Sequence, residues 1–203
     1  MDLSTFDKNR TALVVVDVLE GDNLDTVYSP VTGDFGEKTA RVTEACRMAD
    51  IPVIFCCDAH LFGIDREIEL WGEHGMVGTP EAEPAAILGY SVTDYVIRKR
   101  RYDSFHETSL DMTLRELGCD TIIVIGHDTN ICVMHTLAGA FFRCYDTIVI
   151  SDATRSFLIG DHEEGLKYFE KIYGSLILTT DELIQALEED YDEEYDEEYE
   201  DEI

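Results

Sequence analysis

TIIVIGHDTNICVMHTLAGAFFRC, residues 121–144, contains a β-type run and a helical pattern in direct succession. Its first six residues are mainly β-branched and apolar, which is typical of a buried strand. The part NICVMHTLAGAFFRC (130–144) is apolar on nearly every side and therefore predicts a buried helix. A strand and a helix that are both buried are typical of a parallel sheet with both faces covered.

The same alternation is found on both sides of this segment. Further β-type runs occupy residues 11–18, 51–58, 94–99, 146–151 and 174–179. Apolar residues recur with helical spacing at 36–50, 108–118, 162–173 and 181–189. This pattern predicts an α/β fold with three layers, α/β/α, around a central, mostly parallel sheet of six strands.

Length and composition indicate one domain with an extension. A chain of 203 residues fits one globular domain, which we expect to span residues 1–187. Residues 59–93 are too long for a simple connection, so we expect this insertion to bind the substrate or a metal. Twelve of the sixteen residues 188–203 are acidic, and this charge density predicts a disordered tail.

The charge of the chain argues against several classes of partner. Asp and Glu number 44 against 15 Lys and Arg, a net charge of −29, which disfavours nucleic acid and anionic membranes. No apolar run approaches the ~20 residues of a membrane span, and no signal-peptide pattern is visible. The six cysteines form no CxxC pair, so reduced thiols and a cytoplasmic location are expected.

Ionisable side chains stand at the ends of several predicted strands. Asp17, Asp58 and Lys99 each lie at the end of a β-type run, and Cys132 follows another. Open α/β sheets bind ligands at the carboxyl ends of their strands, so these side chains are expected to meet at one edge. Asp17 could take a thiol proton there, and Lys99 could stabilise the thiolate, which would make an Asp–Lys–Cys triad.

Cys132 is the candidate nucleophile. It falls in the first turn of the helix predicted after the fourth strand. The helix dipole favours a thiolate at this position, and backbone N–H groups can hold an oxyanion there. The alternative is a buried structural cysteine, which is the interpretation we favour for the other five cysteines.

Lys99 belongs to four consecutive basic residues, RKRR (98–101). If the strand continues through Lys99, side chains alternate, and Arg98 and Arg100 face away from it. We expect these two to pair with surface acids, for little net stability. Arg101 shares the face of Lys99, where it could support the site.

Three motifs resemble those of the isochorismatase-like cysteine hydrolase superfamily. They are LVVVD, which ends in Asp17, KRRYDSF, which begins with Lys99, and GHDTNICVMHTLAGA (126–140), which contains Cys132. The resemblance spans about residues 10–180. It implies the isochorismatase-like hydrolase fold and gives all three triad members catalytic roles.

The resemblance also implies a mechanism. Asp17 deprotonates Cys132, and the thiolate attacks a carboxamide carbon. The family has a cis peptide at the position that matches His127 and Asp128. Backbone N–H groups of Asp128 and Cys132 would then form the oxyanion hole.

The insertion contains a candidate metal site. Asp58 and His60 are two positions apart, so both side chains lie on the same side of an extended segment, and His74 follows in WGEHGMVGT (71–79). One carboxylate and two imidazoles suit zinc, manganese or iron. The alternative is two loop histidines without a ligand role. The pattern resembles the nicotinamidase branch of the superfamily, which implies a bound divalent metal, with zinc preferred.

The same branch implies a substrate and further site residues. Nicotinamidases hydrolyse nicotinamide to nicotinate and ammonia in NAD salvage, and the metal is thought to orient the pyridine ring. Glu67 or Glu69 could be a further ligand. Trp71 and Tyr102 could flank the ring, or could simply be core aromatics. The family often forms dimers or tetramers, so a homo-oligomer that acts on a small-molecule amide is expected.

The chain departs from the family pattern in the expected pocket. Leu19 and Glu20 stand where the family commonly has Gln and an aromatic side chain near its first Asp. His127 and Asp128 replace small apolar residues. An acidic Glu20 or Asp128 near the site could favour a different amide or a cationic group. Two alternatives therefore stay open, a related cysteine hydrolase of another amide, ureide or carbamoyl compound, and a non-catalytic binding scaffold.

Overall fold

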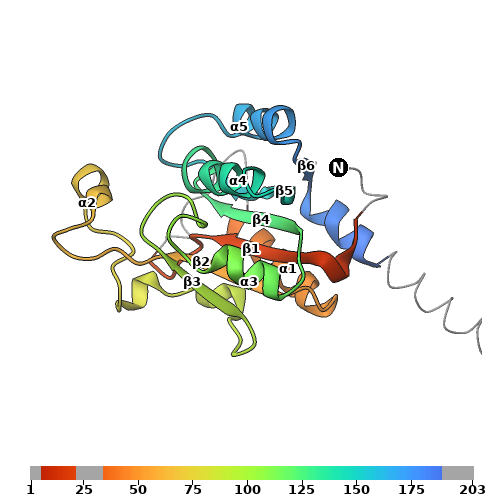
Figure 1. Ribbon diagram of the computed structural model, residues 1–203, viewed down its shortest axis with the longest axis horizontal. Helices are drawn as coiled ribbons and strands as arrows, with labels where there is room; N and C mark the ends of the chain where they lie inside the picture. Colours follow the sequence, from red (N-terminus) through yellow and green to blue (C-terminus); the bar gives the residue numbers. More distant parts are fainter. Residues whose placement is uncertain (1–5, 22–33, 189–203) are drawn as a thin grey trace, which may run out of the picture.

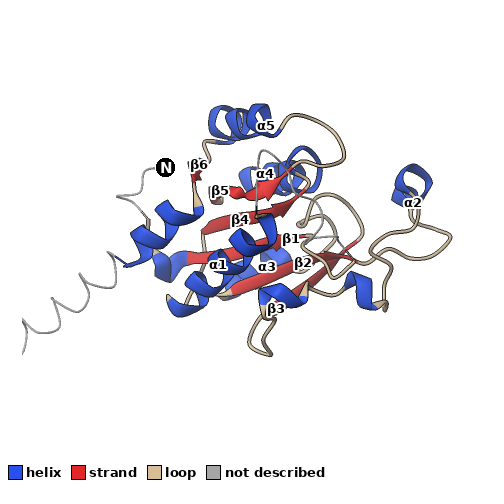
Figure 2. Cartoon of the chain, turned by 180° about the vertical axis from the view of Figure 1, so that it is seen from behind, coloured by secondary structure: helices blue, strands red, loops and turns tan. Residues whose placement is uncertain are grey.

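The structure, a computed structural model, describes residues 6–21 and 34–188. The predicted acidic tail lies outside these ranges except for Glu188. Within them, helices cover both faces of one central sheet (Figure 1, Figure 2). This arrangement confirms the three-layer α/β/α fold that the alternating pattern predicts.

Six strands form the sheet, and every neighbouring pair is parallel. They are β1 (Thr11–Val16), β2 (Val53–Asp58), β3 (Tyr95–Lys99), β4 (Thr121–His127), β5 (Asp146–Arg155) and β6 (Leu176–Leu178). Their order is β3-β2-β1-β4-β5-β6, so the chain runs outward from β1 to one edge and from β4 to the other. The direction of winding reverses between β1 and β4, and ligands of such sheets bind beyond the carboxyl ends of the strands at this switch point.

Helices connect the strands and form the outer layers. They are α1 (Phe35–Met48), α2 (Arg66–Trp71), α3 (Leu110–Glu116), α4 (Met134–Phe141) and α5 (His162–Tyr168). Two π-helical turns, η5 (Thr129–Val133) and η6 (Phe169–Tyr173), adjoin α4 and α5, and residues 180–188 are helical as well. Among the residues that the structure describes, no helix is long and apolar enough to cross a membrane.

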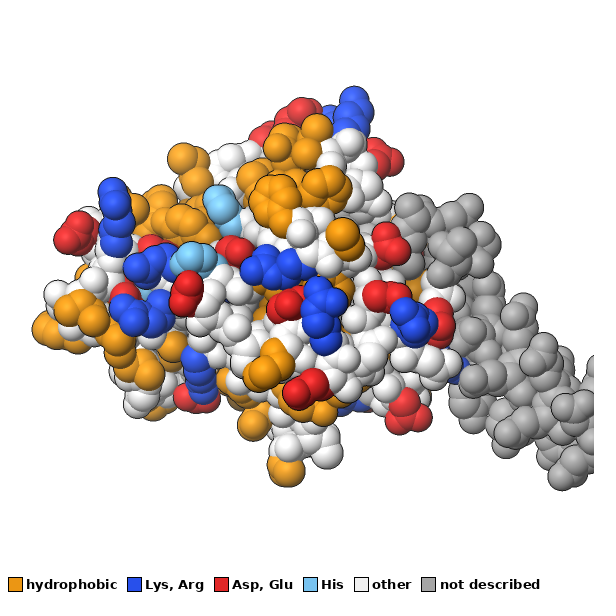
Figure 3. Space-filling model, in the orientation of Figure 1, with side chains coloured by type: hydrophobic (Ala, Val, Ile, Leu, Met, Phe, Trp, Pro, Cys, Tyr) orange, Lys and Arg blue, Asp and Glu red, His pale blue; other side chains and the backbone are white. Residues whose placement is uncertain are grey.

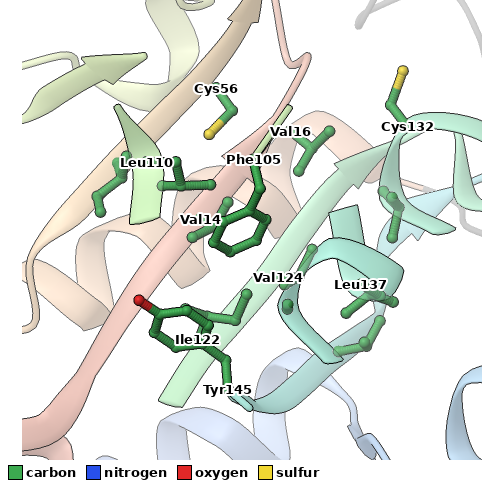
Figure 4. Packing of buried hydrophobic residues seen from close by; sticks show 14 of the residues in the cluster. Val14, Val16, Cys56, Phe105, Leu110, Ile122, Val124, Cys132, Leu137 and Tyr145 are labelled. Carbon is green, nitrogen blue, oxygen red and sulfur yellow. The ribbon is translucent and has the colours of Figure 1, made fainter. Parts of the chain in front are cut away.

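The side chains of each central strand alternate between two hydrophobic cores. Val14 and Val16 of β1 face a core that contains residues of α3, α4 and α5, and Figure 4 shows part of it. Leu13 and Val15 face the opposite core, which contains residues of α1 and of the helical segment 180–188. Each fully buried side chain of this kind contributes about 1.5–3 kcal/mol relative to an exposed one. Burial on both faces explains why these strands are continuous apolar runs.

The insertion between β2 and β3 has little regular structure. It contains α2 and two short 3-10 turns, η3 (Pro80–Ala82) and η4 (Ala86–Leu88), and α2 lies at the end of a projecting loop (Figure 1). Backbone hydrogen bonds fold this loop back on itself: His60 N–H donates to the Gly75 carbonyl at 2.9 Å, and Val77 N–H donates to the His60 carbonyl at 3.0 Å. The loop therefore returns to the carboxyl end of β2.

Candidate active site

The carboxyl ends of β1 and β3 bring a carboxylate and an ammonium group together. Asp17 follows β1 directly, and Lys99 is the last residue of β3. The Lys99 Nζ lies 2.6 Å from Asp17 Oδ2 and 2.6 Å from Asp58 Oδ1, at the end of β2. It also lies 3.6 Å from the Cys132 Sγ. Four residues from four segments thus converge beside the switch point of the sheet.

Asp17 is turned into this cluster by its backbone. Its φ of 50° is in the left-handed region, where Asp and Asn are the non-glycine residues that occur most readily. The Asp17 N–H donates to the Cys56 carbonyl at 2.9 Å, and its Oδ1 accepts from the Asp58 N–H at 2.9 Å. The strand end and the side chain are therefore held by the same neighbouring strand.

Lys99 is charged although its side chain is buried. Only 1% of the residue is exposed, and burial alone lowers the pKa of an ammonium group. The carboxylates of Asp17 and Asp58 outweigh this effect and raise the pKa of Lys99 well above its ordinary value. One buried positive charge therefore serves two carboxylates.

The two carboxylates differ in basicity. Burial and the negative charge of Asp58 raise the pKa of Asp17 to about 6, although Lys99 opposes the shift. Burial would also raise the pKa of Asp58, but Lys99 and His60 outweigh it and hold that pKa below its ordinary value. Asp17 is consequently the better proton acceptor of the pair, because a carboxylate with a raised pKa is a stronger base.

Cys132 lies in η5, the π-helical turn that follows β4. The peptide bond between His127 and Asp128 is cis, as the resemblance implies. The expectation that the helix dipole favours a thiolate stays a prediction, and burial of the thiol opposes it. Burial raises the pKa of Cys132 well above its ordinary value, and the charges of Asp17 and Asp58 add to the shift, while Lys99 opposes it. The thiol is therefore protonated at neutral pH and needs a base.

Two acidic residues that could have favoured a cationic substrate already accept hydrogen bonds from backbone N–H groups. The Asp128 carboxylate accepts hydrogen bonds from the N–H groups of Asn130 at 3.0 Å, Phe157 at 2.8 Å and Leu158 at 2.9 Å. It therefore fixes the loop after β5 to the start of η5. The Glu20 carboxylate accepts from the N–H of Ala86 at 2.7 Å and does not line the cleft.

His127 also has a structural role. Its Nε2 donates to the carbonyl oxygen of Asp17, and its Nδ1 accepts from the Arg155 Nε at 3.1 Å. The Arg155 guanidinium lies 4.2 Å from the ring centroid of Phe35 and 5.3 Å from that of Phe157. Of this group, His127, Arg155 and Phe35 are buried and Phe157 is exposed, and the His127 ring holds the strand end that carries Asp17.

The three predicted metal ligands lie close together. One ligand atom from each of Asp58, His60 and His74 is within 4.8 Å of the others. The His74 Nδ1 donates to the Gly72 carbonyl at 2.8 Å, so its Nε2 can act as a ligand. Both ring nitrogens of His60 are buried, and within the described residues neither has a hydrogen-bond partner. Orphaned imidazole nitrogens beside a carboxylate fit a divalent cation.

Of the two glutamates considered as further ligands, only Glu67 points into the site. It is 4% exposed, and its Oε2 lies 3.6 Å from His60 Nε2, whereas Glu69 is exposed. Burial and the charge of Asp58 raise the pKa of Glu67 to about 7. The helical turn of α2 explains the difference, because residues two positions apart in a helix face different directions.

Asp65 is a member of the site that the sequence did not reveal. Its side chain is fully buried, and its Oδ2 lies 3.5 Å from His60 Nδ1. The Arg100 Nε donates to Asp65 Oδ1 at 3.0 Å, and Arg101 lies 3.6 Å from the same oxygen. Arg101 thus supports the site through Asp65 and does not line it. Asp65 stands just before α2, but no periodic pattern marks it as buried.

One cleft of about 670 Å³ is lined by Asp17, Asp58, Glu67, His74 and Cys132, among others. Trp71 and Tyr102 are on its wall, and the Trp71 Nε1 donates to the Tyr102 hydroxyl at 2.8 Å. Trp71 is 43% exposed, so it is not a core aromatic. Phe157 and Leu158, which no motif of the sequence pointed to, also line the cleft. Their position after the carboxyl end of β5 is the signal that could have identified them.

The chain resembles known proteins over most of its length. A sequence model of the Isochorismatase domain matches residues 11–182. An uncharacterized isochorismatase family protein, YwoC, of Bacillus subtilis (strain 168) is 30% identical over 93% of this chain and 100% of its own length.

Two solved structures share both the fold and part of the sequence. The N-carbamoylsarcosine amidase from Thermoplasma acidophilum is 35% identical, with a TM-score of 0.76 over 85% of this chain and 97% of that one. The pyrazinamidase/nicotinamidase from Streptococcus mutans UA159 is 25% identical, with a TM-score of 0.74 over 83% and 99%. Together with the matched domain, these similarities show that the chain belongs to the isochorismatase family.

Proposed function

We propose that this protein is an amidohydrolase that uses the Cys132 thiol as its nucleophile and hydrolyses nicotinamide to nicotinate and ammonia. The observation that carries the proposal is the position of the Lys99 Nζ, 2.6 Å from Asp17 and 3.6 Å from the Cys132 Sγ. A base, a buried cation and a thiol in direct contact are the groups that thiol-dependent acyl transfer requires.

The first half-reaction forms a thioester. Asp17, whose pKa is about 6, takes the proton of the Cys132 thiol as the sulfur attacks the carboxamide carbon. Lys99 stabilises the developing thiolate. Backbone N–H groups of Asp128 and Cys132 are proposed to hold the oxyanion of the tetrahedral intermediate. The C–N bond then breaks, and ammonia leaves with the proton from Asp17.

The second half-reaction releases the acid. Asp17, again a carboxylate, accepts a proton from a water molecule that attacks the thioester carbon. The C–S bond breaks, nicotinate is released, and the proton returns to the sulfur of Cys132. The same residue thus serves as base and acid in turn, which requires a pKa between those of an ordinary carboxylate and neutral pH.

Asp58, His60 and His74 would hold a divalent cation, with Glu67 beside them. Such an ion would supply a Lewis acid at the cleft wall, where a pyridine nitrogen or a water molecule could bind. Zinc is the preferred ion, because two imidazoles and a carboxylate are ligands that it commonly takes, whereas manganese and iron accept the same set. Trp71 and Tyr102 are proposed to flank the ring of the substrate.

An ammonia-release assay on nicotinamide tests the proposal. Cys132→Ala should lower kcat by at least about a thousandfold, because no other group can form the thioester. Cys46→Ala is the matched control, since Cys46 is buried in α1, away from the cleft, and should retain activity. If Cys132→Ala still releases ammonia, the assignment of the nucleophile is wrong.

A second candidate substrate class is a ureide or another carbamoyl compound. The similarity to an N-carbamoylsarcosine amidase, at 35% identity, favours it. The same half-reactions would apply, because a ureido group also releases ammonia from an acyl carbon. Activity on such compounds without activity on nicotinamide would select this alternative. A chain that releases no ammonia from any amide would instead be a binding scaffold.

A further inference from the structure

The charged side chains on the cleft wall are all acidic. Within the described residues, neither a lysine nor an arginine lines the cleft, whereas its wall includes Asp17, Asp58, Glu67, Glu73, Glu81 and Asp128. Lys99 is close, but it is 1% exposed and already holds two of these carboxylates at 2.6 Å. It is therefore not available as a partner for an anionic group of the substrate.

The undescribed residues cannot supply such a partner either. Residues 1–5, 22–33 and 189–203, which the structure leaves undescribed, contain no lysine and no arginine. Two arginines that flank Lys99 have other roles: Arg98 pairs with Glu83, and Arg100 pairs with Asp65. Among the described residues of the cleft wall, an anion would thus find no lysine or arginine side chain.

Two of the acids stand at the rim. Glu73 and Glu81 are exposed and line the cleft, and in the described part of the chain neither forms an ion pair with a cationic side chain. Gly21 N–H donates to the Glu81 carbonyl at 3.1 Å, which holds the Glu81 backbone beside the strand end that carries Asp17. An incoming substrate therefore passes two uncompensated carboxylates.

A divalent cation would not reverse this balance. Its two positive charges would be matched by Asp58 and Glu67, which lie at the proposed metal site. Glu73 and Glu81 would keep their charges. Like charges placed together at a binding site are costly, and so is a carboxylate buried without a partner.

We infer that this site accepts uncharged or cationic amides and rejects amides that carry a carboxylate, with Glu73 and Glu81 as the residues that determine this specificity. The inference rests on the proposed amide hydrolysis but not on nicotinamide as the substrate. It separates this chain from its relative named for N-carbamoylsarcosine, because sarcosine is an amino acid and carries a carboxylate.

Matched substrate pairs test the inference in the full chain. One pair is a nicotinamide with a ring carboxylate and the methyl ester of that acid. The other is N-carbamoylglycine and its methyl ester. We expect ammonia release to have a kcat/KM at least about tenfold higher for the neutral member of a pair that is hydrolysed. For any pair that is not hydrolysed, binding of both members to Cys132→Ala by calorimetry gives the same comparison.

The role of the rim is tested with Glu73→Gln/Glu81→Gln. In this double variant, the ratio of kcat/KM for the neutral substrate to kcat/KM for the carboxylate should fall by about threefold or more. High salt should lower the same ratio in the wild type, because exposed charges are screened. Glu116→Gln/Glu170→Gln is the matched control, since it removes the same charge at two exposed positions outside the cleft and should leave the preference unchanged.

Each outcome has a separate meaning. A preference for neutral members in the ureido pair, without activity on nicotinamide, would reject nicotinamide as the substrate and keep the inference. Equal or faster reaction of the carboxylates would overturn the inference. An unchanged preference in the rim variant would overturn the assignment of Glu73 and Glu81.

Discussion

Lys99 shows what one buried charge does at the scale of a residue. Of the four consecutive basic residues, it alone is fully enclosed, with its Nζ between Asp17 and Asp58. Arg98 pairs with the exposed Glu83, as expected. Arg100 follows the last residue of β3 and pairs with the buried Asp65, not with a surface acid as expected. The same cluster thus contains one buried charge that holds two carboxylates and others that pair with residues of the insertion.

Replacing Lys99 should destabilise the protein as well as inactivate it. Lys99→Met leaves two buried carboxylates without a cation, which costs about 3–5 kcal/mol of unfolding free energy. Arg98→Gln, in the same strand, removes a partly exposed ion pair and should cost less than about 1 kcal/mol. Urea denaturation of both variants measures the difference. If both variants lose the same unfolding free energy, the carboxylates of Asp17 and Asp58 are neutralised by another group or by protonation.

The site residues at strand ends could be predicted from the sequence. The site residues whose position depends on how the insertion folds could not. Asp17, Asp58 and Lys99 follow recognisable strands, so a parallel sheet places them at one edge whatever the loops do. Asp65 and the choice of Glu67 over Glu69 depend on how α2 docks. A six-residue helix has too few turns to show a periodic pattern, so its buried face cannot be inferred.

The element that carries Cys132 is a second part of the site that the sequence predicts only incompletely. The segment 130–144 is apolar on nearly every side, which predicts a buried helix but contains no signal for its local geometry. The structure forms a π-helical turn at Thr129–Val133 before α4 begins at Met134. Burial also raises the pKa of Cys132, and because it depends on packing from several elements, the sequence of this segment alone does not reveal it.

The return of the insertion to β2 depends on one glycine. Gly75 has a φ of 50°, and a Cβ at this position would lie 2.6 Å from the Cβ of Asp58. Gly75→Ala therefore requires the loop to move away from Asp58, and it should cost about 1–3 kcal/mol of stability. Because His74 is adjacent, zinc affinity measured by chelator competition should fall as well, by about tenfold or more.

Gly78→Ala is the matched control for this prediction. Gly78 also has a positive φ, 79°, but among the described residues a Cβ at this position would meet no atom within 4 Å, so the variant isolates the backbone strain from the clash. We expect a loss of stability without a comparable loss of zinc affinity. If both variants bind zinc like the wild type, the loop does not position His74 as proposed.

At the scale of the whole molecule, the sheet positions the candidate triad, and the insertion positions the proposed determinants of selectivity. The triad lies where β1 and β3 end and in η5, and these elements are held by two hydrophobic cores. The proposed metal ligands His60 and His74, and the rim carboxylates, come from the segment between β2 and β3. A change in the insertion can therefore alter the substrate while the nucleophile and its base stay in place.

The insertion also bears on the oligomeric state. Phe62, Ile64 and Leu70 are 75%, 69% and 64% exposed, and hydrophobic side chains gather at the end of the molecule where α2 lies (Figure 3). An exposed apolar surface suits a partner that covers it by apolar contact, and we expect a second copy of this chain. Light scattering after size exclusion should give a mass above that of one chain.

The triple variant Phe62→Ser/Ile64→Ser/Leu70→Ser should shift this mass toward that of the monomer. The control Met48→Ser/Val92→Ser, at exposed positions elsewhere, should leave the mass unchanged. A wild-type monomer would contradict the expectation, and an oligomer that survives the triple substitution would place the interface on another face.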